Sequence, residues 1–76
     1  MNKNRRERLN NINRLIDVYK SELEDILNEE QDYYDNIPEN LLGSERADIS
    51  EEAISNLEDV VSSLEDVIEK IEEVTA

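Results

Sequence analysis

Proline and glycine occur once each in this chain of 76 residues, at Pro38 and Gly43, and they lie close to Asp35 and Asn36. No glycine or proline interrupts the long segments on either side, and both segments carry apolar residues at helical spacing. Proline removes a helical hydrogen bond, and glycine weakens a helix interior. The sequence therefore predicts an all-α fold in which two long helices are joined near the middle of the chain.

The first segment has apolar side chains at alternating steps of three and four residues, which is the pattern of one helix face. The series is Leu9, Ile12, Ile16, Tyr19, Leu23, Ile26 and Tyr33. A further set widens this stripe: Leu15, Val18, Leu27 and Tyr34. We expect one helix from about residue 3 to residue 34.

The second segment repeats a seven-residue pattern in which two acidic residues follow an apolar residue or Ser50, and two apolar or small residues come next. The repeats begin at Ser50, Leu57, Leu64 and Ile71. An apolar face of three positions in seven suits a helix that touches two or more neighbours. We predict a helix over about residues 44–75 with Ser44 as its N-cap, whereas Asp48, which has capping-box spacing, is the alternative start.

The connection, residues 35–43, is predicted to contain one short turn. Asp35 or Asn36 can cap this turn by accepting a hydrogen bond from a free backbone N–H. Pro38 suits a first turn, and Gly43 is expected to end the turn in the left-handed conformation. Because the connection is short, the two helices must form an antiparallel helical hairpin.

The wide apolar face also predicts self-association, because a chain this short buries little surface and has no cysteine for a disulfide. We expect a homodimer or a higher oligomer, in the simplest case an antiparallel four-helix bundle. The predicted oligomer core is Leu9, Ile12, Ile16, Tyr19, Leu23, Ile26, Ile54, Leu57, Val61, Leu64, Ile68 and Ile71.

The net charge of −13 is distributed unevenly, since residues 1–20 carry +4, residues 21–44 carry −8 and residues 45–76 carry −9. Folding into a hairpin is expected to bring Arg5, Arg6 and Arg8 near Glu69, Glu72 and Glu73. Such a negative chain repels nucleic acid and anionic membranes. The basic N-terminal cluster lacks a recognition helix or aromatic platform, so direct nucleic-acid binding is not expected.

Several kinds of chemistry are excluded by residue content. The chain has no histidine and no cysteine, which removes the usual zinc sites, thiol redox chemistry and histidine catalysis. EF-hand spacing is absent, and two helices offer no pocket that would shift a carboxylate pKa. We therefore expect no metal, no cofactor and no enzymatic activity. No apolar run is long enough to span a membrane or to follow the basic N-terminus as a secretory signal would, so a cytoplasmic location is expected.

The connection end supplies the first group of candidate binding residues: Tyr33, Tyr34, Asn36, Ser44 and Arg46. In the simpler interpretation they cap the helices and close the end of the bundle. In the alternative they form a recognition patch, in which tyrosine stacks and Arg46 anchors a carboxylate or phosphate.

Acidic pairs along the second helix supply the second group: Glu58, Asp59, Glu65 and Asp66. These pairs recur about every 10 Å along the helix. They form either a solvated face that maintains solubility or a ladder of carboxylates that imitates nucleic-acid phosphates.

Residues 29–31 are Glu-Glu-Gln, residues 34–41 are Tyr-Asp-Asn-Ile-Pro-Glu-Asn-Leu, and residues 44–46 are Ser-Glu-Arg, followed by heptads from Glu51. In these elements the chain resembles small acidic helical-hairpin proteins encoded by bacteriophages and prophages, most of them without an assigned function. The resemblance covers about half of the chain. It implies an accessory protein in the cytoplasm of a bacterial host that binds and inhibits or modulates a host component, including anti-phage defence.

The leading hypothesis is therefore a non-enzymatic protein that pairs with itself and binds a host protein. One alternative is an oligomeric sponge for a small anionic signalling nucleotide, with Arg14 and Lys20 of a second chain adding positive charge. The other alternative is an acidic DNA mimic that occupies a basic nucleic-acid-binding groove.

Overall fold

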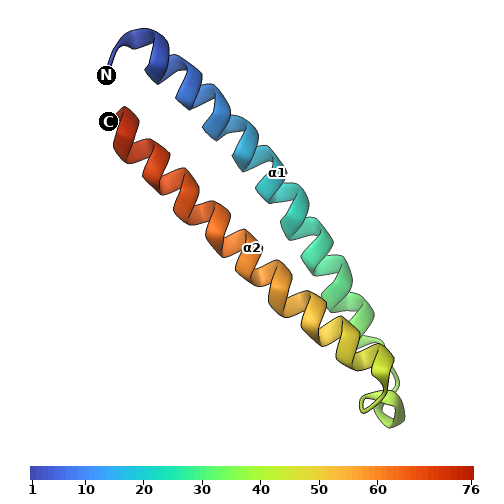
Figure 1. Ribbon diagram of the computed structural model, residues 1–76. Helices are drawn as coiled ribbons and strands as arrows, with labels where there is room; N and C mark the ends of the chain where they lie inside the picture. Colours follow the sequence, from blue (N-terminus) through green and yellow to red (C-terminus); the bar gives the residue numbers. More distant parts are fainter.

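The computed structural model describes residues 1–76 and contains two long α-helices joined by a short 3-10 turn. Helix α1 spans Lys3–Asp35, the turn η1 spans Glu39–Leu41, and helix α2 spans Glu45–Thr75. The helices run antiparallel, so both chain ends lie at one end of a rod and the connection at the other (Figure 1). The rod measures 59 × 15 × 14 Å. The predicted all-α helical hairpin is confirmed.

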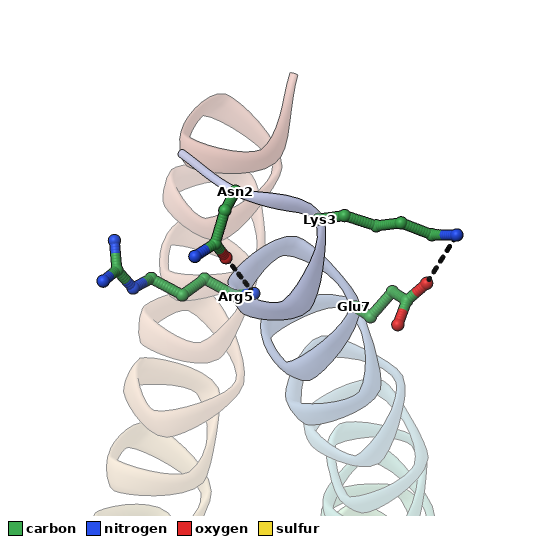
Figure 2. A network of polar contacts seen from close by, with 4 residues as sticks. All are labelled: Asn2, Lys3, Arg5 and Glu7. Atoms are coloured by element: carbon green, nitrogen blue, oxygen red, sulfur yellow. Dashed lines mark hydrogen bonds and ion pairs between the residues drawn. The ribbon is translucent and has the colours of Figure 1, made fainter.

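Both helices begin at a side-chain cap. The Asn2 side-chain oxygen accepts a hydrogen bond from the Arg5 backbone N–H at 2.8 Å (Figure 2). The Ser44 hydroxyl oxygen accepts from the Ala47 backbone N–H at 3.3 Å, as predicted, so the alternative start at Asp48 is not used. Each cap satisfies one of the backbone donors that the first turn of a helix leaves free.

Two predictions about the connection are wrong. Asn36 does not begin a new turn: it is the C-cap of α1, and its amide donates to the Asp32 carbonyl at 2.7 Å. Gly43 is not left-handed, because no residue of the chain has a positive φ. The Ser44 N–H already bonds the Leu41 carbonyl at 3.0 Å, so right-handed backbone closes the turn.

The helices meet along a contact line that we call the seam, in which residues recur at alternating steps of three and four as in a coiled coil. In α1 the seam contains Leu9, Asn13, Ile16, Lys20, Leu23, Leu27, Glu30 and Tyr34. In α2 it contains Ala47, Ser50, Ile54, Leu57, Val61, Leu64, Ile68 and Ile71. All these residues are buried or half-buried.

Polar groups interrupt the α1 side of the seam at three places, Asn13, Lys20 and Glu30. Asn13 donates from its amide to the Ile68 carbonyl at 3.3 Å, while its side-chain oxygen is buried without a partner. The Lys20 ammonium lies 3.5 Å from Glu24 and 3.6 Å from Glu65. Partial burial lowers the Lys20 pKa, but hydrogen bonding and charge from Glu24 and then from Glu65 outweigh it, so the pKa is raised.

The best-packed part of the hairpin lies beside the connection. The four buried residues of the chain are Ile37, Ala47, Ser50 and Ile54. Toward the chain ends the seam residues are only half-buried. The core therefore lies at the turn end of the rod, and the end that carries both termini is the more open one.

Candidate functional site

A continuous row of hydrophobic side chains lies outside the seam, and we call it the apolar face. In α1 the residues of this face are seven apart: Ile12, Tyr19, Ile26 and Tyr33. In α2 they show the same spacing: Ala53, Val60, Val67 and Val74. Apart from the half-buried Ala53 these side chains are exposed, and Tyr19 is the most exposed at 65%.

The two rows of the apolar face lie on the same side of the rod. Arg46 precedes Ala53 by seven residues, so it belongs to the α2 row, and it contacts Tyr33 at the end of the α1 row. The Arg46 Nε donates to the Tyr33 hydroxyl, and the guanidinium carbon is 4.9 Å from the centre of the tyrosine ring. Because the antiparallel helices keep this phase along the seam, the other residues of the two rows lie side by side in the same way along the rod.

The opposite side of the seam is acidic, and we call it the acidic face. In α2 its residues are Glu51, Glu58, Glu65 and Glu72, and in α1 they are Asn10, Asp17, Glu24 and Gln31. Contacts across the seam hold these rows together: Glu65 pairs with Lys20, and Glu51 accepts a hydrogen bond from Tyr34. The hairpin thus separates apolar and acidic side chains onto two opposite faces.

The candidate residues at the connection end have different structural roles. Asn36 and Ser44 are helix caps, as described above. Tyr34 ends the seam and donates from its hydroxyl to Glu51 at 3.1 Å. This hydrogen bond, followed by partial burial and the charges of Glu51, Asp35 and Asp48, raises the Tyr34 pKa.

Tyr33 and Arg46 form one wall of a shallow, open hollow of about 400 Å³ at this end. Glu30, Ile49 and Ser50 complete its lining. Glu30 accepts a hydrogen bond from the Ser50 hydroxyl at 2.9 Å, so its carboxylate already has a donor. The hollow holds one guanidinium and one carboxylate, so it has no net positive charge for a phosphate.

The acidic candidates divide between two orientations. Glu58 and Glu65 lie on the acidic face, whereas Asp59 and Asp66 follow them by one residue and are exposed on the outer side of α2. The predicted oligomer core also divides. The seam contains all six core residues predicted for the second helix and three of those predicted for the first, Leu9, Ile16 and Leu23. The other three lie on the apolar face: Ile12, Tyr19 and Ile26.

The expected ion pairs between the two chain ends do not form. The ends lie side by side, but none of Arg5, Arg6 and Arg8 is in an ion pair. The register places Arg5 in line with the apolar face and Glu72 on the acidic face, so the two charges are on opposite sides. Figure 2 shows the Arg5 side chain extending away from the Lys3–Glu7 pair.

The positions of two groups of residues were not predicted from the sequence. The polar seam positions Asn13, Lys20 and Glu30 were not expected inside the contact line. The apolar face was not separated from the seam, although its signal is present: a second heptad row runs three residues after Leu9, Ile16 and Leu23.

No group of three or more carboxylates is arranged to hold a metal ion. Neither helix is both long enough and apolar enough to cross a membrane. Comparisons with protein-family models, with curated proteins and with solved structures gave no match to this chain. The two faces and the turn end are therefore the candidate functional surfaces of the chain.

Proposed function

We propose that this chain is a non-catalytic binding protein that uses its acidic face and turn end to contact a basic surface of a partner protein. The observation that carries the proposal is the division of the hairpin into an apolar and an acidic face. Such a surface suits recognition of another macromolecule, because complementary charge steers association and fixes orientation. Under the resemblance to phage-encoded proteins the partner would be a host protein, and that origin stays a prediction.

The geometry favours binding over catalysis. General acid–base chemistry needs a carboxylate in a pocket that holds it against the reacting group. The acidic residues here are exposed along a rod, and the hollows on its surface are open to solvent. A row of carboxylates spaced by about 10 Å can instead meet several lysine or arginine side chains of one partner.

Two alternatives stay predictions. The DNA mimic is a special case of the same proposal, in which the basic partner surface is a nucleic-acid-binding groove. The nucleotide sponge needs arginines gathered at one place. Within one hairpin Arg46 is engaged with Tyr33, so no observation favours the sponge.

A pull-down from bacterial lysate at graded salt tests the proposal. The test variant carries Asp17→Asn, Glu58→Gln and Glu72→Gln, which neutralise exposed carboxylates of the acidic face without touching the Lys20–Glu65 pair. The control carries Asp25→Asn, Asp59→Asn and Asp66→Asn, which change the net charge equally at exposed positions on the outer sides of the two helices.

We expect one or more basic proteins to be retained by the wild type and the control, to be lost from the test variant, and to elute as salt rises. Equal retention by both variants, or retention that is indifferent to salt, would contradict the proposal. Circular dichroism checks that each variant keeps its helices.

A further inference from the structure

We propose that the apolar face binds a second copy of this chain, packed face to face with its long axis reversed, so that two hairpins form a four-helix bundle centred on Tyr19 and Val60. This inference is independent of the partner contact proposed above, which uses the opposite face. It is carried by the apolar rows, the size of the face and the distribution of charge.

The apolar face is a surface that the hairpin alone leaves uncovered. Its α1 row runs from Ile12 to Tyr33, a length of about 32 Å at 1.5 Å per residue. Neither row contains a carboxylate, although the chain has 21 acidic residues. A long apolar surface bordered by polar residues marks an interaction site.

The size of the face matches a second hairpin. The whole rod is 59 Å long and 15 Å wide, so the side that carries the apolar face has a projected area on the order of 900 Å², close to the roughly 800 Å² that each partner contributes to a standard interface. Another copy has the same length and the same two rows, so it covers the whole face. A single added helix would cover the groove between the rows and leave the ends of the longer side chains exposed.

Charge selects the reversed orientation. The half of the rod nearest the connection, residues 19–60, holds fourteen carboxylates and two basic side chains, a net charge of −12. The other half, residues 1–18 and 61–76, has a net charge of −1. Parallel hairpins would place the two turn-end halves, each with a charge of −12, against each other. Reversed hairpins place each turn-end half against a terminal half with a charge of −1, so the repulsion is smaller.

The register follows from the helix midpoints. Tyr19 is the middle residue of α1, and Val60 is the middle residue of α2. A two-fold axis that passes between the hairpins at these residues aligns the two rods over their full length. It places the α1 row of one copy against the α1 row of the other, and the α2 row against the α2 row. Ile12 then lies opposite Ile26 of the second copy, as in other interfaces where one patch is self-complementary.

The same register gives the free arginines a counterpart. Arg8 borders the apolar face and is placed opposite Glu29 of the second copy, while Arg5 is placed opposite Tyr33 of the second copy. Neither arginine is in an ion pair within the hairpin. The open terminal end of each rod is also covered by the well-packed turn end of the other.

Measuring the mass in solution tests the assembly. We expect twice the 8.9 kDa of one chain at micromolar concentration. Tyr19→Glu places a charge at the centre of the proposed contact and should weaken dimerisation by at least tenfold, without loss of helix because the side chain is exposed in the hairpin. Val18→Glu is the matched control, since Val18 is also exposed, at 54%, but lies outside the two rows, and this variant should dimerise as the wild type does.

Cysteine cross-linking tests the orientation, and the chain has no cysteine of its own. Under mild oxidation Tyr19→Cys should form a disulfide-linked dimer, because its two copies face each other at the axis. Ile12→Cys alone should not, because its copies are 14 residues and about 21 Å apart along the bundle. An equal mixture of Ile12→Cys with Ile26→Cys should give a linked heterodimer.

A helical chain that stays at 8.9 kDa at high concentration would overturn the proposal, as would an assembly equally weakened by Tyr19→Glu and Val18→Glu. Linkage of Tyr19→Cys to Val60→Cys, with no linkage of either variant to itself, would overturn the reversed orientation. Retention of basic proteins in the pull-down bears on the acidic face alone, so the failure of either proposal can be distinguished from failure of the other.

Discussion

The Ser50 hydroxyl donates a hydrogen bond to the Glu30 carboxylate across the seam, at 2.9 Å, and Ser50 is 1% exposed. The two residues are 20 positions apart in the chain, so this bond ties the helices together one to two turns from the connection. A charged acceptor placed at a helix contact depends on such a donor, because removing the donor leaves part of the carboxylate without compensation.

Ser50→Ala should therefore lower the free energy of unfolding by about 1 kcal/mol, or about 5 °C in Tm for a domain of this size. Ser55→Ala, at an exposed position of the same helix, supplies the control because it has the same change in helix propensity. Thermal melts at one protein concentration measure both. Equal Tm values for the two variants would show that the Glu30 contact contributes nothing.

Asn13→Leu should stabilise the hairpin by about 1–2 kcal/mol, because it removes a buried oxygen without a partner and adds apolar contact in the seam. Asn28→Leu, at an exposed position of α1, is the control. Urea denaturation gives both free energies. A loss of stability in Asn13→Leu would mean that the hydrogen bond to Ile68 outweighs the unpaired oxygen.

Gly43→Ala should raise the free energy of unfolding by about 0.4–1 kcal/mol, chiefly by restricting the unfolded chain. The φ angle of Gly43 is not positive, and an added Cβ meets no atom within 4 Å. A destabilised variant in the same urea assay would indicate that this position needs the left-handed conformation after all.

The contact between Tyr33 and Arg46 should give a coupling of about 0.5–1 kcal/mol in a double-mutant cycle with Tyr33→Leu and Arg46→Gln. Tyr33→Phe keeps the ring but removes the hydroxyl that accepts from the Arg46 Nε, so the coupling left in this variant measures the ring contact alone. Additive effects of the two single substitutions would show that the guanidinium and the ring are neighbours without an energetic link.

The raised Tyr34 pKa has a consequence at alkaline pH. The folded chain favours the protonated phenol, so this group's contribution to stability is present below the usual tyrosine pKa of about 10 and is lost as the pH rises through the higher folded value. Glu51→Gln removes the main cause and should move the titration of Tyr34 to lower pH. The ultraviolet absorbance of tyrosinate follows the titration, and Tyr34→Phe identifies the step by difference.

Glu52→Gln is the control for this titration, because Glu52 is exposed and makes no bond to Tyr34. An unchanged Tyr34 titration in Glu51→Gln would contradict the role given to the hydrogen bond.

The helices and their bounds could be predicted because Pro38 and Gly43 interrupt two otherwise continuous helical patterns. The sequence could not decide which α1 row faces α2. Ile12, Tyr19 and Ile26 are more hydrophobic than Asn13 and Lys20, yet the latter two lie in the seam.

The reason lies near the connection. Tyr34 lies in the seam at the end of α1, and the buried Ile37 donates its N–H to the Tyr34 carbonyl. A stiff helix carries the phase set there through Leu27 and Lys20 to Asn13. Hydrophobicity alone ranks the residues of a helix but does not fix which of two adjacent rows a short turn directs inward. The helix caps could be predicted, because a cap depends on the residue type beside the interruption. The Tyr33–Arg46 contact could not be deduced from spacing, because it depends on which row the turn directs inward.

The concentration of buried residues beside the connection also determines how the hairpin comes apart. Contacts close to the turn join residues only a short distance apart in the chain, so they form quickly and nucleate the pairing of the rest. We therefore expect the helices to pair from the connection toward the termini and to separate in the reverse order. Amide hydrogens around Ile54 should exchange with solvent last, and those near Leu9 and Ile71 first, in a gradient along the rod.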